Sequence, residues 1–320
     1  MRILYITHFM EDYLQDQILY GLRQILGNAC VDYPKKEIMY SNYSKPKQEL
    51  YGRGFTLWKL LSDITVDRES IELLIRNGLY NFIIFGSIKR QKELFAYIST
   101  ISTKEQKFIF LDGEDVTWCY GPALDKGLYF KRERSIDASQ DAPPDIPEWK
   151  DVIWVNDNRL KTINFSIPSI KIREKTSNKI KLFAKHVQCD EAYKLEEVQE
   201  NCQRSYAFSN EYEYYEDIAN SYFGITLKKA GWDCMRHYEI AANLTIPCFY
   251  KLSEKPANCA PHGLVDMKNC ISFSSAKELR EKIPQALNIY DQLQINTKQW
   301  IWDNTCENLA SRILDVACKQ

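Results

Sequence analysis

The feature that most constrains the fold of this chain is a regular alternation of short apolar runs with segments of helical periodicity. In the first half, strands are expected at 2–7, 30–33, 81–88, 107–111 and 151–155, and helices at 11–27, 69–76 and 91–100. The run NFIIFGSI at 81–88 shows no polar alternation, which is typical of a strand buried on both faces of a parallel sheet. The first half is therefore predicted to be an α/β unit with helices on both sides of a parallel sheet.

The same alternation starts again after a charged, turn-rich segment at 169–179. Strands are expected at 179–186, 205–209, 222–227, 246–252 and 269–273, and helices at 191–203, 212–221, 233–244, 275–293 with an interruption near Pro284, and 297–318. The polar, proline-rich segment 133–149 is expected to be a loop. The chain is thus predicted to be an α/β protein with two Rossmann-like domains, 1–170 and 178–296, facing a cleft. Such a cleft is a natural ligand site, because open parallel sheets bind ligands at the carboxyl ends of their strands.

Composition and charge exclude several classes of partner. The 320 residues are enough for one large or two medium domains, and the net charge of −1 gives no electrostatic case for a nucleic-acid partner. No stretch approaches 18 apolar residues, and the chain starts with a strand-like run rather than a leader. We therefore expect a cytoplasmic protein with at most peripheral membrane contact. The ten cysteines lack zinc-site spacing and are expected to be reduced, mostly buried thiols.

The segment KKAGWDCMRHYEIAANLTIPCF at 228–249 combines many charged residues with an apolar end. It is expected to form a loop, a helix and then a buried strand. Asp233 is predicted to cap the helix, because helical periodicity begins directly after it. The free N–H groups and the positive dipole end of such a helix favour an anion, and Lys228 and Lys229 add positive charge beside it. A diphosphate would fit at this point.

Arg236 and Glu239 lie on one stripe of the same predicted helix. A carboxylate at Glu239 would be placed to accept hydrogen bonds from two ribose hydroxyls. The alternative is that Arg236 and Glu239 form an i, i+3 ion pair on a solvated helix, which would stabilise the helix by only ~0.2–0.5 kcal/mol.

The order and spacing of these residues resemble the donor-binding motif of GT-B glycosyltransferases, most nearly that of the exostosin-type and spore-maturation-type (group 1-like) families. The matching residues are Gly231, Arg236, Glu239 and the strand start Ile246-Pro247-Cys248. Thr245 stands two residues before the proline, where those families usually have glycine. The resemblance implies that Glu239 binds the ribose of a nucleotide and that Arg236 and a lysine contact its diphosphate.

The resemblance also implies roles for other parts of the second half. Lys185 and His186 end its first predicted strand, where the GT-B fold often contacts donor phosphates. Residues 297–320 would form the last helix, which in this fold often returns to the first domain. The full predicted donor-binding set is Lys185, His186, Lys228, Lys229, Gly231, Asp233, Arg236, His237 and Glu239.

In the first half, the stretch FLDGEDVTW places three carboxylates directly after a buried strand. Gly113 allows the chain to turn sharply, and Asp112, Glu114 and Asp115 would then face the cleft. One of them, with Asp112 or Glu114 preferred, would take the acceptor proton in an inverting sugar transfer. The alternative is an acidic turn that caps the segment after it.

His8 follows the first strand, in a loop that carries a functional residue in several GT-B enzymes; the alternative is a hydrogen-bonded structural histidine. The predicted catalytic set is therefore Asp112, Glu114, Asp115 and His8. The chain has no P-loop, H-E-x-x-H or G-x-S-x-G motif, which disfavours NTPases, zinc proteases and α/β-hydrolases. It also lacks the Asp-x-Asp metal motif of the other major glycosyltransferase fold, so neither a metal nor another cofactor is implied.

Together these features predict a cytoplasmic glycosyltransferase of carbohydrate biosynthesis. It would move a sugar from a nucleotide-sugar donor, held by the second domain, to an unidentified hydroxyl acceptor held by the first. The acceptor could be a glycan, a lipid-linked molecule or another. Two alternatives stay open: a nucleotide-sugar epimerase of the same fold, and a non-catalytic GT-B domain that only binds glycan or nucleotide.

Overall fold

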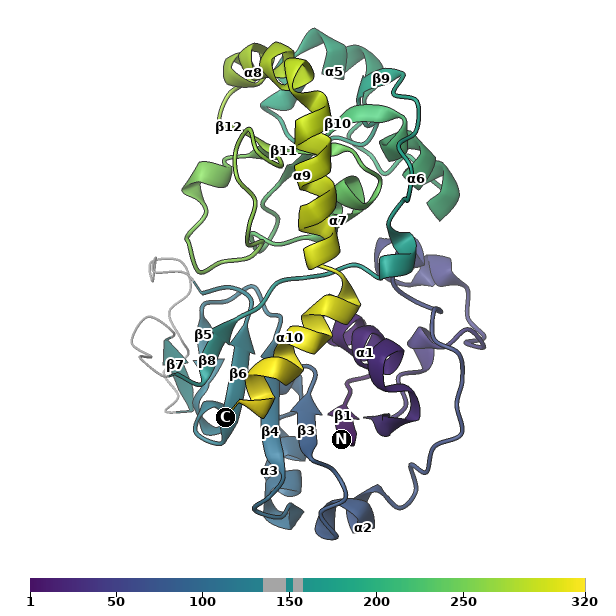
Figure 1. Ribbon diagram of the computed structural model, residues 1–320, viewed down its shortest axis with the longest axis vertical. Helices are drawn as coiled ribbons and strands as arrows, with labels where there is room; N and C mark the ends of the chain where they lie inside the picture. The colour runs from purple at the N-terminus through teal and green to yellow at the C-terminus, as the bar shows by residue number, and fades with distance from the viewer. Residues whose placement is uncertain (135–147, 152–157, 320) are drawn as a thin grey trace. The chain divides into compact units, whose positions relative to one another are not determined.

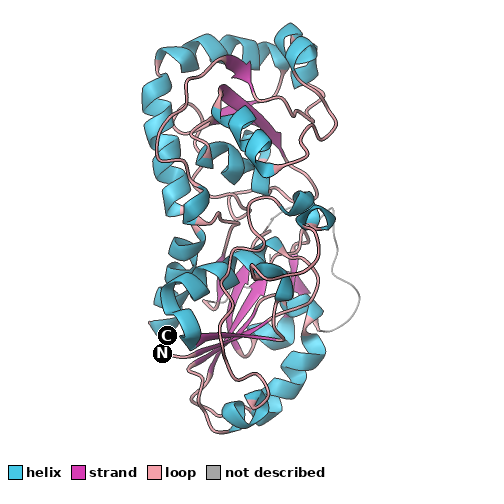
Figure 2. Cartoon of the chain, turned by 90° about the vertical axis from the view of Figure 1, so that its right-hand side faces the viewer, coloured by secondary structure: helices cyan, strands magenta, loops and turns pink. Residues whose placement is uncertain are grey.

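The computed structural model describes residues 1–134, 148–151 and 158–319, and the chain divides into two compact units (Figure 1). Unit 1 comprises Met1–Asn164, Asn258–Ala260 and Cys306–Gln320, and unit 2 comprises Phe165–Ala257 and Pro261–Thr305. Each unit has its own parallel sheet with helices packed against it, which confirms the predicted α/β class (Figure 2). No helix in the described ranges is long and apolar enough to cross a membrane.

The main sheet of unit 1 has six described strands, all parallel, in the order β2-β1-β3-β4-β6-β8. Their bounds are β1 Ile3–Ile6, β2 Cys30–Tyr33, β3 Phe82–Phe85, β4 Lys107–Asp112, β6 Gly127–Lys131 and β8 Leu160–Thr162. The strands β1, β3 and β4 lie at the centre, and nearly all of their side chains are buried because helices cover both faces. Since parallel strands run in one direction, the loops that follow these three strands emerge at the same edge of the sheet.

The helices of unit 1 are α1 Tyr13–Leu26, α2 Ile71–Arg76, α3 Lys92–Ile101, α4 Gly121–Leu124 and α10 Cys306–Cys318. The carboxylate of Asp12 caps α1 by accepting the N–H of Gln15 at 3.1 Å. Helix α10 packs directly on α1 (Figure 1). At this crossing a Cβ on Gly21 would lie 2.1 Å from the carbonyl oxygen of Cys306, so only glycine allows the approach.

The sheet of unit 2 has four described strands, all parallel, in the order β12-β11-β10-β9. The strand bounds are β9 Lys181–Phe183, β10 Ser221–Leu227, β11 Ile246–Tyr250 and β12 Ile271–Phe273. The helix bounds are α5 Glu196–Asn201, α6 Glu211–Ala219, α7 Met235–Ala242, α8 Ala276–Asn288 and α9 Tyr290–Asp303. Its core centres on β10 and β11, where Phe223, Ile225 and Cys248 are fully buried.

Two predictions about the last helices are wrong. The single helix expected at 297–318 is two helices, because α9 ends at Asp303, and the side chain of the cap residue Asn304 turns back to donate to the carbonyl oxygen of Trp300 at 2.7 Å. Helix α8 is not interrupted at Pro284, because this proline lies on the exposed face, where water can replace the lost N–H group. The break comes at Ile289 instead.

Two further predictions, one of a strand and one of a helix, need correction in unit 2. Residues 205–209 form no strand, because Phe208 packs on Tyr214 of α6 with ring centroids 5.6 Å apart rather than joining the sheet. The predicted helix 191–203 is shorter and is limited to α5 after one 3-10 turn. The predicted strand 151–155 lies mostly outside the described residues, as does most of the predicted loop 133–149.

Four described strands of unit 1 were not predicted. β6 and β8 extend the main sheet, and β5 Trp118–Tyr120 pairs with β7 Trp149–Asp151 in a separate two-stranded antiparallel sheet. β5, β7 and β8 are only three residues long and β6 is five, and the sequence pattern did not single out any of the four.

The expectation of buried thiols is confirmed. All ten cysteines are free: Cys202 and Cys234 are half-buried, Cys318 is exposed, and the other seven are buried.

Candidate functional site

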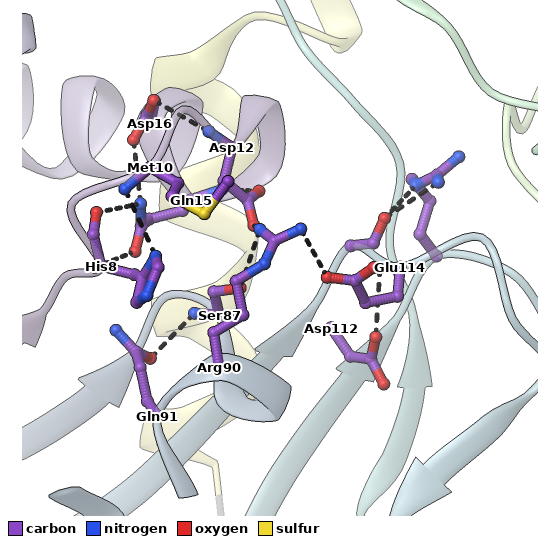
Figure 3. Close-up of polar contacts among 12 residues, drawn as sticks. His8, Met10, Asp12, Gln15, Asp16, Ser87, Arg90, Gln91, Asp112 and Glu114 are labelled. Carbon is purple, nitrogen blue, oxygen red and sulfur yellow. Dashed lines mark hydrogen bonds and ion pairs between the residues drawn. The ribbon is translucent and has the colours of Figure 1, made fainter.

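Three neighbouring strand ends of unit 1 bring polar side chains together. The strands β1, β3 and β4 are adjacent and parallel, so the loops after them share one edge of the sheet. These loops carry His8, Arg90 and Glu114, respectively (Figure 3). We refer to this group as the strand-end cluster.

The loop that carries His8 is held by buried side chains. Gln15 accepts the backbone N–H of His8 at 2.6 Å and donates to its carbonyl oxygen at 3.2 Å. The ammonium group of Lys36 donates to the carbonyl oxygens of His8, at 2.6 Å, and of Met10. Its charge is balanced by Asp16, which lies 3.2 Å away. Gln15, Asp16 and Lys36 are all buried, so the backbone of this loop is bonded to side chains of the core.

The imidazole of His8 is half-buried in this loop. Its Nδ1 accepts the N–H of Met10 at 3.3 Å, and its ring lies 4.5 Å from that of Phe9. Burial lowers the pKa of His8, and the positive charges of Arg90 and Lys36 lower it further. The neutral form of the ring is therefore favoured, with its proton on Nε2 because Nδ1 accepts from Met10.

Arg90 links the loops of the strand-end cluster. Its guanidinium lies 2.8 Å from the carboxylate of Asp12, the cap of α1, and 2.9 Å from Oε1 of Glu114. Figure 3 shows the guanidinium between these two carboxylates. One third of the side chains of Arg90 and Glu114 is exposed, so this pair meets solvent at the edge of the sheet.

The three predicted carboxylates of the β4 turn have different environments. The side chains of Asp112, Glu114 and Asp115 are 0%, 33% and 42% exposed, respectively. Asp115 contacts Arg132. The structure therefore places Glu114 and Asp115 at the surface and removes Asp112 from it.

Asp112 has partners on both carboxylate oxygens. It accepts the hydroxyl of Tyr129 at 2.6 Å and the ammonium of Lys131 at 3.0 Å, and Lys89 lies 3.3 Å away. Burial by itself would raise the pKa of Asp112, but the charges of Lys131 and Lys89 outweigh it, and the pKa is lowered. An ionised carboxylate with two occupied oxygens is poorly suited to take a proton from an acceptor.

Lys89 is a buried charged residue that sequence reasoning missed. It donates to the carbonyl oxygen of Trp118 at 2.7 Å, and its ammonium lies 3.8 Å from the ring centroid of that residue. Burial lowers its pKa to about 7, which the charge of Asp112 only partly opposes. The sequence signal was limited to a lysine beside Arg90 at the end of a buried strand.

We expect Lys89 to make unfolding pH-dependent. Between about pH 7 and pH 10 the unfolded chain holds its proton and the folded chain does not, so the free energy of unfolding should rise with pH by up to ~1.4 kcal/mol per unit. Lys89→Met should remove this contribution. Urea unfolding between pH 7 and pH 9.5 measures the slope, with Lys126→Met, an exposed lysine of the same unit, as the control. Equal slopes in wild type and Lys89→Met would contradict the burial argument.

In unit 2, the segment between β10 and α7 differs in one respect from its prediction. Cys234, not Asp233, occupies the cap position of α7. The carboxylate of Asp233 is buried, where it accepts the N–H of Phe165 at 2.7 Å and the hydroxyl of Tyr238 at 3.0 Å. It therefore anchors the start of unit 2, and the prediction of a helix cap is wrong.

Arg236 and Glu239 have different partners within unit 2. Arg236 donates to the carbonyl oxygen of His186 at 2.9 Å, and its guanidinium lies 5.7 Å from the ring centroid of Tyr214. Glu239 accepts the hydroxyl of Tyr214 at 2.7 Å. The buried tyrosine thus fixes the carboxylate, while the backbone after β9 fixes the guanidinium.

The other predicted residues of unit 2 fall into two groups. His186 is buried with Nδ1 at 3.0 Å from the carbonyl oxygen of Ser205, and burial, with the charge of Arg236 adding to it, lowers its pKa to about 4. His186 is therefore neutral, and its contribution to this site is the backbone carbonyl that accepts from Arg236. Lys229 contacts the side-chain amide of Gln188, and Lys185 is exposed. These residues and Arg236 surround the carboxyl ends of β9 and β10.

The remaining three predicted residues stabilise the segment between β10 and the start of α7. His237 is fully buried, with Nδ1 at 2.8 Å from the hydroxyl of Thr226 and its ring stacked on Phe249. Lys228 has its ammonium 5.2 Å from the ring centroid of Trp232. The carbonyl oxygen of Gly231 accepts the N–H of Lys229 at 3.0 Å and closes the turn. His237 is therefore part of the core rather than of a surface site.

Comparison with known proteins finds solved structures that match nearly the whole length of this chain. A scan against protein-family models finds no match, and a search of curated proteins finds none either. Among solved structures, a glycosyltransferase from Rickettsia africae has a TM-score of 0.57 at 10% identity, covering 99% of this chain and 98% of that one. HepE from Anabaena in complex with UDP has a TM-score of 0.55 at 9% identity, covering 100% of both chains. The chain has the GT-B fold. A third structure, HepE in complex with UDP-glucose, agrees, with a TM-score of 0.54 at 9% identity and full coverage of both chains.

The GT-B resemblance drawn from the sequence is thus confirmed at the level of the fold. The narrower resemblance to exostosin-type and spore-maturation-type families stays a prediction. Within the GT-B fold of this chain, the strand-end cluster belongs to the unit that contains the N-terminus, and Arg236 and Glu239 belong to the other unit.

Proposed function

We propose that this protein is a glycosyltransferase that moves a sugar from a nucleotide-sugar donor to a hydroxyl acceptor. The observation that carries the proposal is the arrangement of Arg236 and Glu239 on α7, each fixed by a different neighbour, at the carboxyl end of β10. This is where an open parallel sheet binds ligands. The chain shares its fold with HepE, whose structures contain UDP and UDP-glucose.

In the proposed donor site, cationic side chains bind the diphosphate. Lys185, Lys229 and Arg236 lie around the carboxyl ends of β9 and β10, and their charges offset the negative charge that develops on the leaving nucleoside diphosphate. Glu239, held by Tyr214, accepts the two ribose hydroxyls. With cationic side chains in this role, we propose that transfer needs no metal ion, so EDTA should leave turnover unchanged.

Unit 1 holds the acceptor in this proposal, and Glu114 takes the proton from its hydroxyl. Arg90 lies 2.9 Å from Oε1 of Glu114, and one third of the Glu114 side chain is exposed, so its carboxylate is open to an acceptor from solvent. His8 is the second candidate base at the strand-end cluster. A base positioned in this way contributes typically 10²–10⁴-fold to a rate.

A nucleotide screen tests the proposal. Thermal unfolding is measured with UDP, GDP, CMP, dTDP and ADP, and UDP is expected to stabilise most, by ~2.7 kcal/mol at 100 times its Kd. Turnover of UDP-glucose to UDP with a pool of glycan acceptors then measures transfer. Formation of an isomeric nucleotide-sugar would point to an epimerase, and tight binding without turnover would point to a non-catalytic domain. No stabilisation by any of the five nucleotides would contradict the proposal.

A further inference from the structure

The turn that carries Glu114 is held by three charged side chains that are almost completely buried: Asp112, Lys131 and Arg132. Asp112 accepts the backbone N–H of Glu114 at 3.2 Å, and Lys131 donates to the carbonyl oxygen of Glu114 at 3.0 Å. Arg132 donates twice to the carbonyl oxygen of Gly113, at 3.0 and 2.9 Å. The carbonyl oxygen of Gly113 and both the N–H and the carbonyl oxygen of Glu114 are therefore each bonded to a buried charged side chain.

The same residues tie the turn to the sheet. Asp112 and Lys131 face each other in the register of the parallel strands β4 and β6, where their side chains form an ion pair at 3.0 Å. Tyr129, from the same face of β6, completes the shell of Asp112. Buried charges are costly unless each has partners, and apolar side chains would fill the same space at lower cost. Stability alone is therefore a poor explanation for the charged side chains of Asp112 and Lys131 at this position.

The other end of Glu114 is also fixed. Arg90 holds its carboxylate at 2.9 Å and is itself held by Asp12. Glu114 thus meets solvent while both its backbone and its carboxylate are restrained.

We propose that Lys131 and Arg132, together with Asp112, are positioning residues that set the carboxylate of Glu114 for proton transfer. The inference rests on the proposed function, in which Glu114 is the base. Asp112, which the sequence offered as a candidate base, acts through Glu114 instead. The charged network serves to hold the Glu114 carboxylate in place. This matters because a displacement of about 1 Å at a reacting group can lower a rate ~10²-fold.

A double-mutant cycle on turnover tests this role. Lys131→Met should lower kcat about 10- to 100-fold and leave the Kd for UDP within about twofold. In the Glu114→Gln background the same substitution should have no further effect on kcat, because the group that it positions is already absent. Lys150→Met, which removes an exposed lysine of unit 1, is the matched control and should leave kcat unchanged in both backgrounds.

A second variant covers the case in which Lys131→Met does not fold. Arg132→Lys keeps the charge but loses the paired bonds to Gly113, and it should show the same dependence on Glu114. Equal losses of kcat with and without Glu114, or no loss in either background, would overturn the inference while wild-type turnover still supports the proposed function. A wild-type protein that binds UDP but transfers no sugar would overturn both.

Discussion

In the Glu239→Ala variant, the affinity for the nucleotide found in the screen is expected to fall by about 10²–10⁴-fold. Two ribose hydroxyls lose a charged acceptor, and each hydrogen bond to a charged group contributes ~1.5–3 kcal/mol. Every ~1.4 kcal/mol corresponds to a factor of ten in Kd. Isothermal titration of the wild type and the variant measures the change directly.

The fold should survive this substitution. Glu239 is half-buried, and in the structure its carboxylate accepts the hydroxyl of Tyr214. Loss of that bond leaves a buried hydroxyl without this acceptor, which costs on the order of 1–3 kcal/mol of stability. Tyr214→Phe removes the same hydrogen bond and keeps the carboxylate, so it separates the two effects. Glu281→Ala, an exposed glutamate of α8 in the same unit, controls for loss of a surface charge.

The outcome decides between two interpretations of the α7 segment. Weak binding in Glu239→Ala but near-normal binding in Tyr214→Phe means that the carboxylate itself contacts the nucleotide. Unchanged affinity in Glu239→Ala, with only lower stability, means that Glu239 serves Tyr214 and that the donor-site proposal is wrong at this residue.

The sequence predicted most of the fold because long apolar strands carry strong local signals. The continuous run that became β3, and the strand–loop–helix–strand order that became β10, α7 and β11, were visible without any tertiary information. The strands β6 and β8 were not predicted from the sequence. Their positions are set by pairing with β4 and with each other.

Polar residues were harder to assign, because their roles depend on distant partners. Asp233 has the residue type and place of a helix cap, yet it accepts the N–H of Phe165, which lies 68 residues earlier in the chain. Asp112 and Glu114 are two residues apart and looked equivalent, but Lys131 and Tyr129 of β6 enclose only Asp112. Since β6 was not among the predicted strands, this difference could not be foreseen. Lys89 was overlooked because its lowered pKa depends on burial, and the contact that covers it comes from Trp118, 29 residues later in the chain.

Glu114→Gln is expected to lower turnover by about 10²–10⁴-fold and to leave nucleotide affinity unchanged, because a general base contributes about that factor to a rate. The amide keeps the size of the side chain and an oxygen that can accept from Arg90, so the strand-end cluster should keep its geometry. What is lost is the basic oxygen that takes the acceptor proton. Initial rates of UDP release, and titration with UDP, measure the two quantities separately.

The matched control is Asp115→Asn. Asp115 is on the same turn and more exposed, but its carboxylate contacts Arg132 rather than Arg90. The amide that replaces this carboxylate keeps an oxygen that can accept from Arg132, so turnover should stay within a few-fold if Glu114 is the base. If Glu114→Gln keeps wild-type turnover, His8, the other candidate base of the strand-end cluster, is tested next with His8→Ala. Wild-type turnover in both Glu114→Gln and His8→Ala would mean that neither residue is a base. A retaining transfer, which needs no separate base of this kind, would then describe the reaction better than an inverting one.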